Sequence, residues 1–267
     1  MNILATNRMT GGLIVFLIAI LVNIIPTQAQ TGDNQLKAMS DEVNQMCPID
    51  MGMLGTMSST EYLPVSKTFV YNFNIDPTLV TLEQLAASGT SVMKHNMQTT
   101  LSQTAYHPFL QILVGADARL CAKFHQDQKN PITIIISTDE LREMLSTKRT
   151  DRSLARESVE NTVAMENSRY PQNLGNGMLM TKAYCNGNQV VYECQIDPSI
   201  LTAADIAASE QMIKDAMINL MASDLGMNAF CKNVVAADYS IRYHYYEPGT
   251  NRYHDIIITA EDLAKII

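Results

Sequence analysis

The chain has 267 residues and a formal net charge of −8, because 27 Asp and Glu residues outnumber 19 Lys and Arg residues. An acidic chain without a basic patch lacks the surface that nucleic acids and anionic membranes attract, so neither is expected as a partner. The hydrophobic share of 46% is enough to build a globular core, and 17 Met with no Trp indicate a core of adaptable side chains.

The N-terminus is typical of an export signal. Residues 13–25 form an apolar run that only Asn23 interrupts, and the run is shorter than the roughly 20 residues that a membrane-spanning helix needs. Small residues precede the bond between Ala29 and Gln30, where we expect cleavage by signal peptidase. The mature chain, residues 30–267, would then be secreted or periplasmic, with no stable membrane insertion. An uncleaved N-terminal anchor is the alternative.

Most of the mature chain is an internal duplication. The segment NIDPTLVTLEQLAAS at 74–88 returns as QIDPSILTAADIAAS at 195–209, an offset of 121 that also matches the flanking strands. Solenoid repeats have periods of about 20–50 residues, so these copies are two domains or two halves of one pseudo-symmetric domain. The expected organisation is a signal peptide at 1–29, an N-terminal helix at 30–46, repeat unit 1 at 47–146, a linker helix at 147–169 and repeat unit 2 at 170–267.

Each copy predicts the same elements in the same order. A first strand is expected at 53–62 and at 177–185, and the next strand, as in FVYNFNIDP at 69–77, alternates with the period of a strand that has one buried face. Helices, a second hairpin and a short final helix follow. The expected fold is α+β, with two tandem repeats that are each a four-stranded antiparallel sheet of two hairpins, with helices packed on one face. Four pairs have the spacing of a helix capping box: Thr81 and Gln84, Ser137 and Glu140, Thr202 and Asp205, and Thr259 and Asp262.

A short motif stands before the first unit. The segment VNQMCPID at 43–50 contains Asn-x-x-Cys-Pro after a polar helix. It resembles a group of uncharacterised bacterial secreted or envelope proteins, including ones from Bacteroidetes, although Tyr170 replaces Cys47 in the second copy. The resemblance implies an exported protein with α-β-β-α-β-β units, and it transfers no catalytic residue. The tandem layout is also similar to that of secreted β-lactamase inhibitor proteins, in architecture alone.

The cysteines do not indicate a metal or redox site. Their number is odd, so at least one is free, and no C-x-x-C or Cys/His cluster with zinc spacing is present in the sequence. We therefore predict no metal and no cofactor. Cys194 and Cys231 align with core positions of the first copy, so buried free thiols are the favoured interpretation. A disulfide, if one forms at all, is expected between these two. The five cysteines are Cys47, Cys121, Cys185, Cys194 and Cys231.

Two histidines near the C-terminus are close in sequence, His244 and His254. Pairing Tyr246 with Asn251 across the EPGT turn places His244 opposite Tyr253 and sends the two imidazoles to opposite faces of the sheet. A metal site that uses both histidines is therefore not favoured, and aromatic packing between strands is the preferred interpretation.

Two duplicated pairs of acids were considered as catalytic carboxylates, Asp76 with Asp197 and Asp117 with Asp238. Asp-Pro at a strand exit is a turn-forming dipeptide, and an Asp between a helix and a strand commonly bonds nearby backbone groups. No Gly-rich phosphate loop, G-x-S-x-G elbow or H-E-x-x-H helix occurs in the sequence. We predict no catalytic residue.

The last hairpin carries the predicted binding surface. Its core face is expected to hold Ile241, Ile256 and Ile258, which sends the intervening residues to the opposite face. Tyr and Arg are enriched in binding hot spots, although the tyrosines could instead pack against the other repeat. The candidate binding residues are Arg242, His244, Tyr246 and Tyr253.

The sequence therefore favours a secreted or periplasmic, non-catalytic binding protein whose partner is an unknown protein or small ligand. Two similar modules on one chain can raise affinity through effective concentration. An inhibitor of a secreted enzyme is one alternative, and an envelope hydrolase or another enzyme of unknown type is a second.

Overall fold

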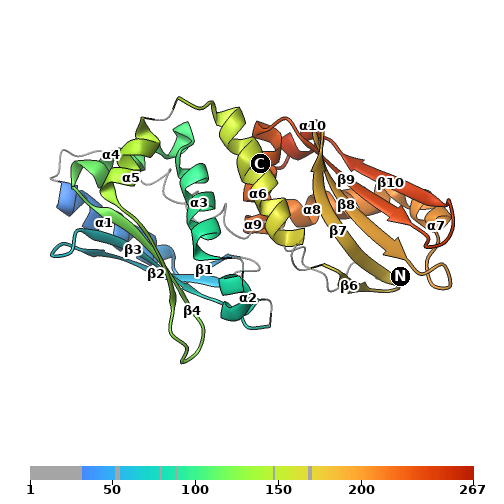
Figure 1. The fold of residues 1–267 in the computed structure, drawn as a ribbon, viewed down its shortest axis with the longest axis horizontal. Helices are drawn as coiled ribbons and strands as arrows, with labels where there is room; N and C mark the ends of the chain where they lie inside the picture. Colours follow the sequence, from blue (N-terminus) through green and yellow to red (C-terminus); the bar gives the residue numbers. More distant parts are fainter. Residues whose placement is uncertain (1–31, 52–54, 79, 88, 147, 168–169) are drawn as a thin grey trace. The chain divides into compact units, whose positions relative to one another are not determined.

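A computed structural model describes residues 32–267 with gaps at 52–54, 79, 88, 147 and 168–169 (Figure 1). The predicted signal peptide and its cleavage site at Ala29 and Gln30 lie outside the described residues. The chain divides into two compact units, with the described residues up to Leu154 in one and Ala155–Ile267 in the other. In the described ranges, no helix has both the length and the apolar content for a membrane crossing.

The first unit is a five-stranded sheet with helices, and its strands follow the order β1-β2-β3-β4-β5. Helix α1 packs on β2 and helix α3 lies against β5. Its elements are α1 (Gly32–Met46), β1 (Ile49–Asp50), β2 (Thr56–Leu63), β3 (Thr68–Asn74), α2 (Leu82–Ala87), α3 (Thr90–Leu101), the short 3-10 helix η4 (Thr104–Tyr106), α4 (His107–Gly115), β4 (Arg119–His125), β5 (Ile132–Ile136) and α5 (Thr138–Leu145).

The second unit repeats this order, with the sheet β6-β7-β8-β9-β10. The same sequence of strands and helices in both units agrees with the expected duplication and with the α+β class (Figure 1). Its elements are α6 (Asp151–Asn167), β6 (Gln172–Gly175), β7 (Met178–Asn186), β8 (Gln189–Ile196), α7 (Ala203–Ala208), α8 (Glu210–Ser223), α9 (Leu225–Ala236), β9 (Ser240–Tyr246), β10 (Tyr253–Ile258) and α10 (Ala260–Ala264).

The predicted four-stranded antiparallel sheet is wrong in two respects. Strands β3 and β4 are parallel, as are β8 and β9, because the chain crosses over through helices between them and enters the next strand at the same end. A fifth strand, β1 or β6, pairs antiparallel with β2 or β7. These strands are too short to show a periodic pattern. Each sheet is therefore mixed, with two hairpins joined at its centre by a parallel pair.

The helices expected at 30–46 and 147–169 correspond to α1 and α6, and each packs in the unit whose strands follow it. Helix α6 buries Ala155, Val159 and Val163 in the core of the second unit. Its residue Asn167 accepts a hydrogen bond through Oδ1 from the backbone N–H of Ala183 on β7, at 3.0 Å. Helix α6 is thus fixed to the second sheet.

The asparagine of the Asn-x-x-Cys-Pro motif has the same role in the first unit. Asn44 Oδ1 accepts from the backbone N–H of Thr60 at 2.7 Å, and its Nδ2 donates to the carbonyl of Thr60 at 2.9 Å. An amide that satisfies both groups of one strand residue ties α1 to β2. The motif is therefore explained by a structural bond between helix and strand.

Two buried tyrosines differ between the units. Tyr192 on β8 donates its hydroxyl to Glu166 Oε2 at 2.9 Å, and both residues are buried. Tyr71 holds the equivalent place on β3, but its buried hydroxyl has no hydrogen-bond partner among the described residues. The alignment of Asn44 with Asn167 explains this difference, because it places Val43 where the second unit has Glu166.

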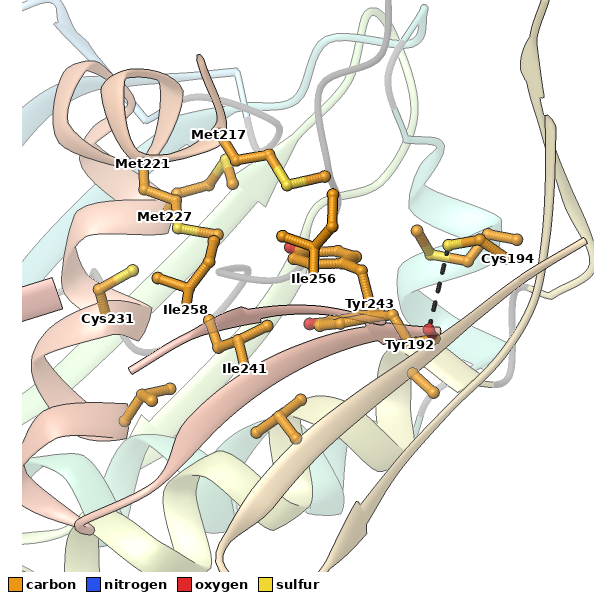
Figure 2. Packing of buried hydrophobic residues seen from close by; sticks show 14 of the residues in the cluster. Tyr192, Cys194, Met217, Met221, Met227, Cys231, Ile241, Tyr243, Ile256 and Ile258 are labelled. Carbon is orange, nitrogen blue, oxygen red and sulfur yellow. Dashed lines mark hydrogen bonds between the residues drawn. The ribbon is translucent and has the colours of Figure 1, made fainter. Parts of the chain in front are cut away.

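The core of the second unit is rich in sulfur (Figure 2). Met217, Met221 and Met227 pack with the aromatic and aliphatic residues of the sheet, as the composition predicted. Cys194 and Cys231 are buried in this core, but they lie at opposite ends of the cluster in Figure 2 and both are free thiols. Buried free thiols are what the sequence favoured, and the disulfide that it left open between these two residues is not formed in the structure. Burial raises the pKa of each thiol to about 12, which makes both unreactive at neutral pH.

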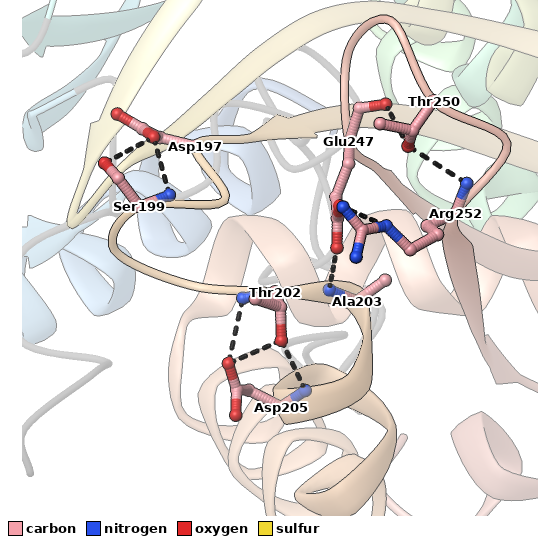
Figure 3. Close-up of polar contacts among 8 residues, drawn as sticks. All are labelled: Asp197, Ser199, Thr202, Ala203, Asp205, Glu247, Thr250 and Arg252. Carbon is pink, nitrogen blue, oxygen red and sulfur yellow. Dashed lines mark hydrogen bonds and ion pairs between the residues drawn. The ribbon is translucent and has the colours of Figure 1, made fainter.

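A buried side chain after β9 holds the start of α7 (Figure 3). Glu247 is 1% exposed, and its Oε1 accepts from the backbone N–H of Ala203 at 3.0 Å while Oε2 pairs with Arg252 Nε at 2.8 Å. Gln126 has the same role in the first unit, because its Oε1 accepts from the backbone N–H of Leu82 at 3.1 Å. The first N–H groups of a helix lack partners within the helix. Both units therefore hold the start of this helix with a buried side-chain oxygen, from a carboxylate in the second unit and from an amide in the first.

The predicted capping boxes are present, and two of them also form ion pairs. Glu140 caps α5 and accepts from Lys94 of α3, with 2.7 Å between Nζ and Oε1. Asp262 caps α10 and pairs with Lys214 of α8 at 2.7 Å. Burial raises the pKa of Glu140, but the bonds from Lys94 and Ser137 overcome this and lower it to about 2. The bond from Lys214 holds the pKa of Asp262 well below its usual range.

Acid is expected to destabilise both units through these two carboxyls. Their pKa is lower in the folded chain than the ordinary value of about 4, so the folded state binds fewer protons than the unfolded state. Their contribution to the free energy of unfolding is complete above about pH 5 and is lost progressively as the pH falls below about 4. Urea unfolding at neutral pH and near pH 3 measures this loss.

The variant Asp262→Asn removes one titrating partner and is expected to lose less stability than the wild type on acidification. Glu261→Gln, an exposed neighbour on α10 outside the ion pair, serves as the matched control. Equal losses for the wild type and Asp262→Asn between the two pH values would contradict the prediction.

Candidate functional site

The predicted binding residues lie together on the face of the second sheet opposite the core, which we call the outer face. Tyr246 pairs with Tyr253, His244 with Asp255 and Arg242 with Ile257 across β9 and β10, so all six side chains share that face. On the other face, the structure buries the residues that the sequence assigned to the core: Ile241, Ile256 and Ile258.

The register of this hairpin differs from the predicted one by two residues. The backbone N–H of Glu247 donates to the carbonyl of Arg252 at 3.0 Å, so these two residues still pair and the turn begins at Pro248. Gly249 supplies the positive φ of 73° that the turn needs. His244 is therefore opposite Asp255 instead of Tyr253. An even shift keeps every side chain on its predicted face, and His254 still lies on the face opposite His244.

His244 is the centre of the outer face. Its Nδ1 lies 2.7 Å from Asp255 Oδ1, and Arg242 Nη1 lies 4.0 Å from Asp255 Oδ2. A carboxylate only accepts hydrogen bonds, so the neutral imidazole carries its proton on Nδ1 and leaves Nε2 as an acceptor. The ring centroid of Tyr246 lies 5.8 Å from that of His244 with 20° between the planes, and Tyr253 lies at 5.1 Å and 43°.

Strands β7 and β8 extend this surface with residues that the sequence interpretation missed. Lys182 Nζ lies 4.6 Å from the ring centroid of Tyr184, and Lys182 pairs across the strands with Glu193. Burial and a hydrogen bond with Glu193 raise the pKa of Tyr184. A β-bulge at Thr181 shifts the alternation of β7 by one residue. Strict alternation along the sequence therefore could not assign Lys182 and Tyr184 to this face.

The outer face of the first unit has a different composition at the same positions. Cys121, Lys123 and His125 of β4 replace Arg242, His244 and Tyr246. On β5, an isoleucine pairs with Cys121 and a threonine pairs with Lys123. His125 Nε2 lies 3.3 Å from Asn72 Oδ1, a bond between polar side chains without a tyrosine. The stacked rings beside an ion pair on the face opposite the core are thus a feature of the second unit.

The remaining candidate residues have local structural roles. Asp76 and Asp197 accept bonds from the backbone N–H and the hydroxyl of a residue two positions later, as Figure 3 shows for Asp197 and Ser199. Asp117 and Asp238 adopt positive φ of 52° and 60° after a helix. His254 Nε2 lies 2.9 Å from Glu210 on α8.

The arrangement offers molecular recognition more readily than catalysis. His244 and Asp255 are paired as in a catalytic dyad, but no described nucleophilic side chain is hydrogen-bonded to Nε2 of His244. Within the described part of the chain, no cluster of three or more His, Cys, Asp or Glu side chains has the geometry of a metal site. What the outer face presents is rings, hydrogen-bonding groups and paired charges.

Comparisons with known proteins assign no family. No family model matches the chain, and no curated protein matches it. A solved structure of a candidate secreted protein from Pseudomonas aeruginosa is similar, with 14% sequence identity and a TM-score of 0.36. The match covers 44% of this chain and 99% of the other. A likeness of this size assigns no function.

Proposed function

We propose that the mature chain is an exported, non-catalytic binding protein that recognises its partner through the outer face of the second sheet. The signal-like N-terminus supports export, and the residues of the outer face support recognition. Tyr253 is 61% exposed there, beside the part-buried His244, Tyr246 and Arg242. Tyr and Arg form binding hot spots because they combine a large contact area with directed hydrogen bonds.

The difference between the two units is the observation that carries this proposal. Both units repeat the same elements, and both bury an apolar core on the matching face. If the outer face only had to be solvated, the simpler residues of the first unit would be sufficient in both copies. The second copy instead has two tyrosine rings against one Asp–His pair, an arrangement that the fold itself does not require.

The double variant Tyr246→Ala/Tyr253→Ala tests the proposal. The mature wild type and the variant are immobilised and exposed to separate protein and polysaccharide fractions from the envelope of the producing cell. We expect the variant to retain at least about tenfold less of the bound material, because two large contact side chains are removed. The melting temperature is expected to stay nearly constant, since Tyr253 is 61% exposed and Tyr246, which is half-buried, makes a long hydrogen bond with Thr181 at 3.4 Å.

The matched control is Lys123→Ala/His125→Ala, which alters the positions of the first unit equivalent to His244 and Tyr246. It is expected to bind as the wild type does. Unchanged retention by the tyrosine variant would overturn the proposal. A large fall in melting temperature would also count against it, because it would show that the rings hold structure together, as in the alternative in which they pack against the other repeat.

A further inference from the structure

We propose that the outer face of the second sheet binds a neutral carbohydrate chain. This inference rests on the function proposed above and identifies the chemical class of the partner. Three observations support it: the compensation of charge on the surface, the placement of its rings beside polar groups, and the interruption of its apolar area by polar groups.

The charges on the outer face compensate each other. Asp255 contacts His244 and lies near Arg242, and Lys182 pairs across the strands with Glu193. Electrostatic complementarity favours partners of opposite charge, and this part of the surface has no excess of either sign. A nucleic acid, an acidic polysaccharide or a highly charged peptide would therefore gain little here. A neutral ligand suits this surface better, if the ligand can form hydrogen bonds with the paired polar side chains.

The rings lie beside polar groups on this surface, and a sugar presents the same two kinds of group. A pyranose ring presents faces of C–H bonds, which pack on aromatic rings, and an edge of hydroxyls that both donate and accept hydrogen bonds. The ring centroid of His244 lies 5.1 Å from that of Tyr253 and 5.8 Å from that of Tyr246, so the three rings form one cluster, in which Tyr253 is the exposed member. Nε2 of His244 offers an acceptor within this cluster, and the guanidinium of Arg242 offers donors on the same strand.

Polar side chains interrupt the exposed apolar area of the outer face, which does not favour a protein partner. Protein interfaces have a core of continuous apolar contact that excludes water. On β10 the exposed apolar side chains are Tyr253 and Ile257, and Asp255 stands between them on the same face. A sugar chain, whose apolar faces are themselves separated by hydroxyls, fits this alternation better than an apolar protein patch does.

Titration calorimetry on the mature chain tests the inference with four neutral hexasaccharides as probes: cellohexaose, maltohexaose, mannohexaose and N-acetylated chitohexaose. We expect saturable binding of at least one of them and weaker or no binding of an oligogalacturonate of the same length. Tyr253→Ala is expected to weaken the binding about tenfold or more through loss of stacking, whereas Tyr253→Phe keeps the ring and the affinity. Lys123→Ala on the first unit is the matched control.

The outcomes separate this inference from the proposed function. If none of the hexasaccharides binds while envelope protein is retained through Tyr246 and Tyr253, the carbohydrate inference is wrong and the binding function stands. If a hexasaccharide binds equally well to the wild type and to Tyr253→Ala, the sugar site lies elsewhere and the inference is also wrong. If neither sugar nor envelope material depends on these tyrosines, both proposals fail.

Discussion

Replacing Glu247 by alanine is expected to lower the free energy of unfolding of the second unit by about 2–4 kcal/mol. The substitution removes the acceptor for the backbone N–H of Ala203 at the start of α7, and it leaves a cavity where a nearly fully buried side chain stood. In the unfolded chain this N–H group is hydrogen-bonded to water, and in the folded variant it would be buried without any partner. The substitution therefore costs more than the same substitution at an exposed position.

The conservative variant Glu247→Gln separates the hydrogen bond from the charge. It keeps the carbonyl oxygen that accepts from Ala203, and glutamine is the residue that holds α2 at the equivalent Gln126. Only the ion pair with the exposed Arg252 is lost, so we expect a cost within about 1 kcal/mol. Native-state hydrogen exchange, resolved by peptide, measures both variants and uses the first unit as an internal control. Equal losses of protection for alanine and glutamine would show that the helix bond contributes nothing.

Removing one hydroxyl is expected to affect the two units very differently. Tyr192→Phe leaves the buried Glu166 without its 2.9 Å bond, and we expect it to cost the second unit about 1–3 kcal/mol. Tyr71→Phe removes a buried hydroxyl that no described residue bonds, so it is expected to be neutral or stabilising by up to about 1 kcal/mol. The two substitutions are chemically identical and occupy equivalent strand positions, and each is therefore the control for the other.

Urea unfolding and peptide-resolved hydrogen exchange give the size of each effect and the unit in which it occurs. The combination Tyr192→Phe/Glu166→Val gives the second unit the same pair of side chains, Phe and Val, that Tyr71→Phe gives the first unit beside Val43. We expect it to recover part of the lost stability, because both polar partners are then replaced. A loss for Tyr71→Phe as large as that for Tyr192→Phe would refute the explanation, since it would show that the hydroxyls do not decide stability at this position.

The faces of the strands could be predicted from the sequence because alternation reports burial directly. The side chains of Phe69, Tyr71 and Phe73 on β3, and of Ile241, Ile256 and Ile258 on the last hairpin, are buried as their period indicates. The capping boxes were predictable for a similar reason, since cap and partner are three residues apart. Local spacing was enough wherever the interacting groups are close in sequence.

Relations between distant segments could not be predicted in this way. Alternation does not reveal which strand lies beside β3 or in which direction it runs, so the parallel pairing with β4 was missed. The bonds of Glu166 to Tyr192 and of Glu247 to Ala203 join separate elements. The same limit applied to the outer face, where Asp255 became the partner of His244 only once the register of the turn was known.

The parallel pair at the centre of each sheet also sets an order of events in folding. The hairpin of β2 with β3 and that of β4 with β5 pair residues that are close in sequence, so each can form rapidly from local interactions. The pairing of β3 with β4 must close a loop that contains α2, α3 and α4, and its entropic cost precedes any gain from contact. The joining of two preformed hairpins is therefore the step that we expect to limit the folding rate of each unit.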